Sequence, residues 1–209
     1  KGGWLIVPNY PSRRRMPLDP VMGGYGGTEM KLLYQGHVGE GHGLTRIIEF
    51  IKTDPSLRLT IVGPGNDDYI QLLKDKVKEL EISNQVQILD VVPYSELVAI
   101  TRAHQVGLAI HEPVNLAFRT AALASNKIYE YAAAGLPILY YRDEHYMKHL
   151  GNYQWAFPTS LDVVDLSKNI CRIRKSYRSL SESARRDFFD KLNFAAIFKP
   201  VLDRLEDLS

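Results

Sequence analysis

Cysteine is nearly absent from the sequence, which limits what can hold the fold together. Cys171 is the only cysteine among 209 residues, so the chain forms no internal disulfide, and such cysteine usage is typical of a reducing compartment. Cys171 lies between Ile170 and Arg172 in a pattern of helical spacing, so we expect a structural thiol and not a nucleophile. The fold must therefore rest on burial of apolar side chains.

Long apolar runs and an excess of one charge are also lacking. No stretch approaches the ~18–20 apolar residues of a membrane-spanning helix, and the first residues have no signal-peptide pattern. Lys and Arg number 26 and Asp and Glu 24, a net charge of +2, which gives no indication of nucleic-acid binding. We expect a cytoplasmic protein that binds no nucleic acid, with a peripheral position on the inner face of a membrane as the alternative.

Proline and glycine are concentrated in residues 1–30. A short apolar run is followed by Pro8-Asn9-Tyr10-Pro11, three arginines and the glycine-rich stretch 23–27. This density interrupts regular elements, so residues 1–30 are predicted to form an extended segment and linker. A phosphate-binding loop is the weaker interpretation of the paired glycines, because no apolar strand leads directly into them. The folded domain is expected to span 31–209.

Beyond the linker, apolar runs alternate with segments of helical periodicity. Near-continuous apolar strands are typical of a parallel sheet that is covered on both faces. Their alternation with helices predicts an α/β fold with a Rossmann-like, doubly wound parallel sheet and trailing C-terminal helices. From about residue 160 the pattern is helical, and Pro200 is expected to interrupt the last helix. The predicted strands are 32–34, 57–62, 86–89, 106–110 and 136–140, the predicted helices are 44–53, 70–80, 94–101 and 126–134, and residues 111–124 are expected to be irregular.

The first candidate site follows the strand at 32–34. Residues 36–43 contain four glycines together with His37 and His42. Open α/β sheets bind ligands at the carboxyl ends of their strands. Glycines let a phosphate approach the backbone, and the next helix points its amides at the anion. A structural turn explains the glycines equally well, so both interpretations stay open.

The second candidate site is the start of the helix predicted at 126–134. Ser125 is a typical N-cap residue, which places Asn126 and Lys127 in the first turn, where amides and a cation favour a pyrophosphate. Glu130 can share a face with both, and its carboxylate suits the two hydroxyls of a ribose. The alternative is an exposed Lys127–Glu130 helix pair worth roughly a few tenths of a kcal/mol.

Three segments in this order resemble the C-terminal domain of group 1, GT4-like glycosyltransferases. They are Tyr-Gln-Gly…Gly-His-Gly-Leu at 34–44, Ile-Val-Gly-Pro-Gly at 61–65 and Asn-Lys-Ile-Tyr-Glu-Tyr-Ala-Ala-Ala-Gly-Leu-Pro at 126–137. The resemblance extends from about Leu32 to Tyr140, and residues 8–11 resemble the stretch that joins the two halves of such enzymes.

The resemblance implies one half of a GT-B fold, with a UDP- or GDP-sugar as donor substrate and no further cofactor. It implies a retaining transferase whose acceptor is a glycan or a membrane-associated, lipid-linked glycan. An N-terminal acceptor-binding domain would supply part of the catalytic machinery, so no catalytic residue is assigned here. A chain long enough for only one such domain is expected to be inactive alone.

The resemblance also implies residue roles. Glu130 matches the second carboxylate of the family's Glu-x7-Glu signature and would hold the donor ribose. Asn126 and Lys127 match the segment that meets the diphosphate, and the loop at 90–93 matches the usual location of the nucleotide base. The residues expected to bind the nucleotide sugar are Gly36, His37, His42, Val91, Val92, Ser125, Asn126, Lys127 and Glu130.

Two departures from the family pattern count against full function. The first signature carboxylate is replaced by Ala122, and histidines 37 and 42 stand where the family places arginine and lysine. A bound diphosphate would raise a histidine pKa, so we expect donor affinity to rise as pH falls from about 7.5 to 6. The departures also support an alternative function, a degenerate non-catalytic nucleotide-binding module that supports a partner subunit.

Other patterns carry weaker hypotheses. Glu112 ends a strand and is a candidate contact for the donor sugar. His145 and His149 have the spacing of metal ligands, but no third ligand is placed, so no metal site is predicted. A nicotinamide-dependent dehydrogenase is disfavoured because the strand that should end in an acidic residue ends in Gly63. A sugar-nucleotide epimerase shares the fold and stays open. The basic stretch at 172–186 is interpreted as a solvated face, with anionic lipid as the alternative.

Overall fold

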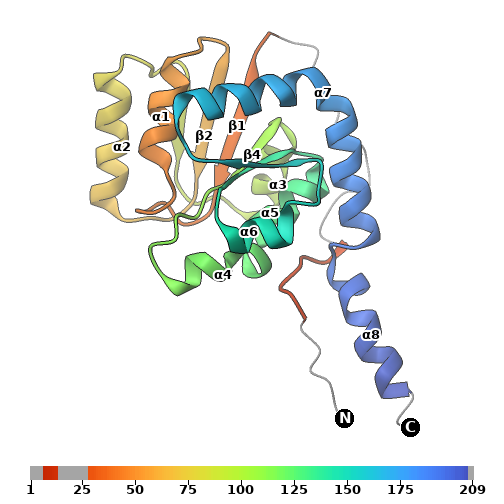
Figure 1. The fold of residues 1–209 in the computed structure, drawn as a ribbon. Helices are drawn as coiled ribbons and strands as arrows, with labels where there is room; N and C mark the ends of the chain where they lie inside the picture. The colour runs from red at the N-terminus through yellow and green to blue at the C-terminus, as the bar shows by residue number, and fades with distance from the viewer. Residues whose placement is uncertain (1–6, 14–27, 207–209) are drawn as a thin grey trace.

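The computed structural model describes residues 7–13 and 28–206. These residues contain a six-stranded sheet of order β3-β2-β1-β4-β5-β6 in which every pairing is parallel. Helices cover both of its faces (Figure 1). The strands are β1 (Met30–Gln35), β2 (Leu57–Val62), β3 (Val86–Leu89), β4 (Val106–Ala109), β5 (Ile138–Tyr141) and β6 (Ala156–Thr159). The helices are α1 (Leu44–Lys52), α2 (Asp67–Glu79), α3 (Tyr94–Arg102), α4 (Leu116–Ala124), α5 (Asn126–Ala134), α6 (Glu144–Leu150), α7 (Val163–Asp190) and α8 (Phe194–Glu206).

The strand order confirms the doubly wound α/β fold that the sequence predicts. From β1 the chain moves outward through β2 and β3, then returns to place β4 on the other side of β1. In sheets of this kind, ligands bind at the carboxyl ends of the strands where the order reverses. Here the reversal lies between β1 and β4, so the loop after β1 borders the expected crevice.

Two clusters of buried side chains fill the two faces of the sheet. The first cluster unites α1 and α2 with the first half of α7, and the second unites α5 and α6 with the end of α7. Strand β1 serves both, because Leu32 and Tyr34 belong to the first cluster while Leu33 belongs to the second, as the alternation of side chains along a strand requires.

Helix α7 covers both faces because it is kinked. Ser176, inside its 28 residues, has φ −125° and ψ 19°. Side chains from Leu166 to Leu180 pack in the first cluster, and Ala184 and Phe188 pack in the second. No helix of the described residues has both the length and the apolar character needed to cross a membrane.

Helix α8 extends away from the sheet, next to the described N-terminal segment 7–13 (Figure 1). It has no buried residue. The N-terminal segment is fixed by backbone contacts, since the Phe194 amide donates to the Pro11 carbonyl at 3.1 Å and the Asn9 amide donates to the Leu123 carbonyl at 3.1 Å. The Tyr10 ring packs on Tyr129 with centroids 4.0 Å apart. Most of the predicted linker, including the glycine-rich stretch 23–27, lies outside the described residues.

Two expectations for regular structure were wrong, and two elements were not predicted. The stretch expected to be irregular contains α4, because Asn115 caps it by accepting from the Phe118 amide at 2.9 Å. Helix α6 and strand β6 were not predicted. Pro158 hides β6 in the sequence and is tolerated because β6 is an edge strand. Helix α8 continues through Pro200, since the loss of one N–H bends a helix without always ending it.

Candidate functional site

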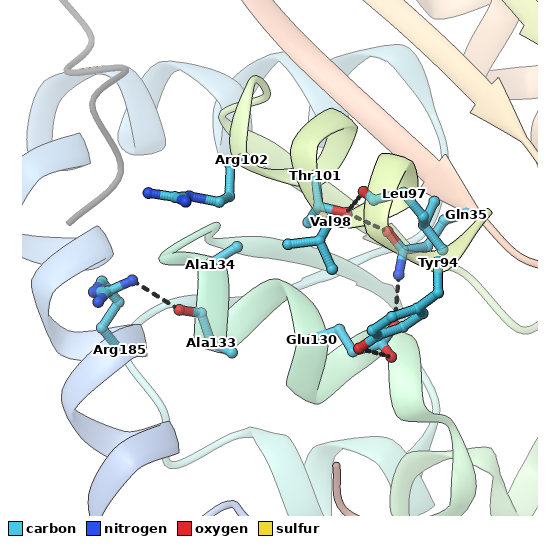
Figure 2. Close-up of a pocket in the computed structure, with 10 residues that line it drawn as sticks. All are labelled: Gln35, Tyr94, Leu97, Val98, Thr101, Arg102, Glu130, Ala133, Ala134 and Arg185. Carbon is cyan, nitrogen blue, oxygen red and sulfur yellow. Dashed lines mark hydrogen bonds between the residues drawn. The ribbon is translucent and has the colours of Figure 1, made fainter. Parts of the chain in front are cut away.

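A pocket lies between α3 and α5, at the carboxyl end of β1. Its cavity volume for a water-sized molecule is about 20 Å³, and about 350 Å³ of space is unoccupied when the solvent at its open mouth is included. In Figure 2 the side chains of Gln35, Tyr94 and Glu130 gather at one end, and Arg102 and Arg185 lie at the other. The wall between the two ends is largely apolar. The lining residues are Gln35, Tyr94, Leu97, Val98, Thr101, Arg102, Glu130, Ala133, Ala134 and Arg185.

Glu130 is the half-buried carboxylate of this pocket. Its Oε2 accepts a hydrogen bond from Gln35 Nε2 at 2.6 Å, and its Oε1 lies 3.5 Å from the Tyr94 hydroxyl. Lys127 and Glu130 thus do not form the exposed helix pair that the sequence left open, because no ion pair joins them and Glu130 contacts residues of β1 and α3.

Lys127 lies one turn before Glu130, over the glycine loop. Its Nζ is 4.2 Å from the centroid of the Tyr34 ring. A Cβ added to Gly36 would lie 3.3 Å from the same Nζ atom. Burial lowers the pKa of Lys127 to about 7, and nearby Glu130 acts in the opposite direction. Within the described ranges no carboxylate lies within 4.0 Å of Nζ. Lys127 is thus a desolvated amine that an anion would help to protonate.

The start of α5 differs in detail from the prediction. Ser125 occupies the N-cap position, as expected, but its side chain makes no capping hydrogen bond. Helix α4 ends at Ala124 and α5 begins at Asn126, so Ser125 alone turns the chain between the two helices. Asn126 is exposed at this end. The first amides of α5 therefore lack a side-chain cap, as a phosphate site requires.

The glycines of the first two loops permit a close approach of their backbones. Gly63 has φ +138°, and a Cβ there would lie 2.2 Å from the Gly36 carbonyl oxygen. A Cβ on Gly65 would lie 2.2 Å from the Val38 carbonyl oxygen. Packing alone therefore explains these two glycines. Gly36, with φ +120°, lies directly beneath the Lys127 amine, so a structural role and a position at the site coincide there.

The two histidines of the glycine loop lie in different environments. His37 is exposed. His42 is 4% exposed, lies 5.3 Å from the ring of His111 and 4.8 Å from that of Phe118, and its Nδ1 is 3.0 Å from the Ile110 carbonyl. Burial, followed by the charge of Lys127, lowers the pKa of His42 to about 4. His42 is thus neutral between pH 7.5 and 6 in the ligand-free protein.

The loop after β3 borders the pocket through Tyr94. Val91 is 65% exposed, Val92 is half-buried against the second cluster, and Tyr94, which begins α3, is 41% exposed. The hydroxyl of Tyr94 near Glu130 brings this loop to the same end of the pocket. Among the pocket-lining residues, Tyr94 is thus the nearest to the expected base loop, and Val91 and Val92 do not belong to the lining.

Glu112 and Ala122 lie apart from the pocket. The Glu112 carboxylate forms an ion pair with Arg46 of α1, and its amide donates to the Gly41 carbonyl at 2.8 Å. Glu112 thus contacts the glycine loop but is not among the residues that line the pocket. Ala122 is fully buried in α4, and its carbonyl accepts from the Tyr129 hydroxyl. The helix leaves no room for a carboxylate at this position.

The remaining candidates make local contacts. His145 and His149 have ring centroids 4.8 Å apart, and the described residues contain no group of three potential metal ligands. In the basic stretch, Arg174 pairs with Asp54 and Arg178 with Glu182. Cys171 is exposed, which differs from the buried position typical of a structural thiol.

Sequence reasoning missed the roles of Gln35 and Thr101 in this pocket. Gln35 is 3% exposed and Thr101 is 4% exposed, and both are joined by hydrogen bonds to the Glu130 end. A polar residue that ends an otherwise apolar strand was the available signal for Gln35. Thr101 gave no signal, because a threonine in a helix is common and its partner lies far away along the chain.

No protein-family model matches the chain, and no curated protein sequence matches it at a significant level. Similarity is found among solved structures. HepE of Anabaena, solved with UDP and glucose, has a TM-score of 0.66 at 14% identity over 86% of this chain and 48% of its own. Sucrose-phosphate synthase of Thermosynechococcus elongatus has a TM-score of 0.66 at 18% identity over 87% and 46%.

WaaG, a glycosyltransferase involved in lipopolysaccharide biosynthesis, has a TM-score of 0.63 at 15% identity over 93% of this chain and 54% of its own. The chain thus spans about half the length of these structures. At such low identity the likeness establishes the fold. The chain has an α/β, Rossmann-like fold that matches about half of each of these structures.

Proposed function

We propose that this chain is the donor-binding half of a group 1, GT4-like glycosyltransferase. It would transfer a sugar from a UDP- or GDP-sugar to a glycan or a lipid-linked glycan. The observation that carries the proposal is that Lys127 and Glu130 both lie near the uncapped start of α5, next to the loop that follows β1. The matched fold of HepE, which was solved with UDP and glucose, supports it.

The proposed chemistry divides the site between two groups. Lys127 and the first amides of α5 would bind the diphosphate and stabilise the negative charge that develops as it leaves the sugar. Glu130 would accept hydrogen bonds from the ribose hydroxyls, and the loop with Val91 and Val92 would contact the base. Glu112 stays a candidate for the donor sugar. The sugar would be transferred to the acceptor with retained configuration as the nucleoside diphosphate leaves, and the nucleotide sugar is itself the substrate, so no further cofactor is proposed.

The acceptor site would belong to an N-terminal domain that residues 1–30 join to the folded domain 31–209. Exposed apolar side chains on α8, namely Phe194, Leu202 and Leu205, support a partner surface. The isolated chain would then bind the donor without turning it over. A cytoplasmic location with a membrane-associated acceptor belongs to the same proposal.

A non-catalytic nucleotide-binding module is the second candidate. Two observations favour it, since Ala122 is buried where the family carries a carboxylate and His42 is neutral where it carries a cation. This module would bind a nucleotide weakly or only together with a partner subunit.

Calorimetric titration of the chain with UDP, GDP and ADP tests the proposal. We expect one nucleotide to bind, and Glu130→Ala to weaken it by about tenfold, or 1.4 kcal/mol. Glu79→Ala is the matched control, because that carboxylate is exposed on α2, and it should bind as the wild type does. A folded chain that binds none of the three nucleotides would contradict the proposed donor site and favour the second candidate.

A further inference from the structure

The carboxylate of Glu130 is joined to the interior by a chain of buried polar groups. Gln35 Nε2 lies 2.6 Å from Glu130 Oε2, and Thr101 Oγ1 lies 2.8 Å from Gln35 Oε1. The same threonine oxygen lies 2.7 Å from the Leu97 carbonyl. Figure 2 shows this chain running from α3 through the end of β1 to α5. We call it the Gln35 relay.

The chemistry of the relay permits one orientation of the Gln35 amide. A carboxylate oxygen at 2.6 Å requires a donor, so the NH₂ group faces Glu130 and the amide oxygen faces Thr101. The Thr101 hydroxyl then donates its hydrogen to that oxygen, with the Leu97 carbonyl as a second acceptor nearby. The opposite amide orientation would place two acceptors against each other at Glu130.

The position of Gln35 is itself fixed from the sheet. The backbone N–H of Gln35 donates to the Tyr131 hydroxyl at 2.9 Å, and that hydroxyl donates to the Leu33 carbonyl at 3.1 Å. The Tyr131 ring packs so closely on β4 that a Cβ on Gly107 would lie 2.4 Å from it. Two adjacent residues of α5 thus bind Gln35, because Tyr131 contacts its main chain and Glu130 contacts its side chain.

Buried polar groups cost free energy unless they serve a satisfied network. In the Gln35 relay, all three side chains line the pocket, but Gln35 and Thr101 are almost fully buried, whereas Glu130 is half-buried. We infer that Gln35, oriented by Thr101, is a positioning residue that fixes the Glu130 carboxylate for the two hydroxyls of a ribose. The inference rests on the proposed function. It adds a specificity to the proposed donor site, namely a preference for ribonucleotides over deoxyribonucleotides.

The test compares UDP with 2′-deoxy-UDP, or GDP with 2′-deoxy-GDP if guanine is the preferred base, by calorimetric titration. Gln35→Met keeps the side-chain length and removes the donor to Glu130. We expect it to lower the affinity for the ribonucleotide by roughly tenfold, as for loss of a hydrogen bond to a charged group. The affinity for the deoxyribonucleotide should change much less. In a Glu130→Ala background the same change should have no further effect.

Thr101 provides a second, milder perturbation that leaves Gln35 in place. Thr101→Val keeps the shape and removes the hydroxyl, so the ribonucleotide preference should fall by less than with Gln35→Met, and Thr101→Ser should restore it. Urea unfolding checks that each variant is folded.

The outcomes separate the inference from the function on which it rests. A wild type that binds no nucleotide would overturn the proposed function and the relay's role with it. Normal binding by the wild type, combined with equal losses for both nucleotides in Gln35→Met and Thr101→Val, would overturn the relay alone.

Discussion

The two faces of the sheet are built from different side chains. The first cluster, beneath α1 and α2, is mostly leucine, isoleucine and valine. The second, beneath α5 and α6, is rich in alanine and tyrosine. Its tyrosines make directional contacts, since the Tyr131 hydroxyl reaches Leu33 and the Tyr146 hydroxyl reaches the Phe118 carbonyl at 3.2 Å. The aliphatic cluster stabilises the fold through non-directional apolar packing. The hydrogen bonds of the second cluster also fix the position of α5, which carries the candidate site.

The largest expected effect is a loss of stability when a side chain of the aliphatic cluster is shortened. Ile51, at the end of α1, is fully buried in the first cluster. Ile51→Ala should lower the free energy of unfolding by about 2–5 kcal/mol, and Ile51→Val by about 0.5–1.5 kcal/mol. Nucleotide affinity of the folded protein should stay unchanged in both, because the residue lies away from the pocket. Urea unfolding and calorimetric titration measure the two quantities, and a parallel loss of affinity would refute the division between the faces.

Acid should weaken the folded state through His42. Its pKa is lowered to about 4 in the fold against about 6.5 when unfolded, so the unfolded chain binds the extra proton. The contribution of neutral His42 to the free energy of unfolding is complete above pH 6.5. It is lost as pH falls toward 4, by up to about 1.4 kcal/mol per pH unit. His42→Gln, which retains a donor for the Ile110 carbonyl, should make unfolding free energies less dependent on pH in this window. An unchanged slope would contradict the assignment.

Tyr131→Phe sharpens the comparison on the second face. It removes the hydroxyl that joins Gln35 to Leu33 and keeps the ring against Gly107. We expect a loss of about 1–3 kcal/mol in unfolding free energy, because a buried amide is left without its acceptor. Unlike Ile51→Val, which costs a comparable amount, it should also weaken nucleotide binding. Equal affinities in the two variants would show that α5 is held by packing alone.

The smallest effect is a pH dependence of donor binding through Lys127. A bound diphosphate would raise the lowered pKa of this amine, so binding takes up a proton. Affinity for the nucleotide sugar should be highest below pH 7 and should fall by up to about tenfold per unit above it. Lys127→Arg keeps the charge at every pH, so its affinity should be flat from pH 6 to 8.5. A wild type that is equally flat would exclude Lys127 as the titrating group.

The sequence predicts most of the fold because its signals are local. The strand at 57–62 and the helix at 126–134 coincide with β2 and α5, since apolar runs and glycine boundaries mark them. The missed elements have ambiguous signals. Helix α4 lies in a stretch that follows a proline, and β6 contains a proline that only its edge position makes acceptable.

The residues of the candidate site also divide into those that a local sequence pattern predicts and those that it does not. Lys127 and Glu130 are one helical turn apart, so spacing alone places them together. The Gln35 relay joins residues that lie 66 and 95 positions apart, and no local pattern indicates such pairs. Burial also changed the interpretation of His42, because only the folded chain places its ring beneath Phe118 and near a lysine.

The kink of α7 at Ser176 has a consequence for how the molecule opens. Because one helix closes both clusters, its detachment would expose apolar side chains on both faces of the sheet at once. Partial unfolding of a single face is therefore costly, and the two faces are expected to exchange their amide hydrogens in one cooperative transition.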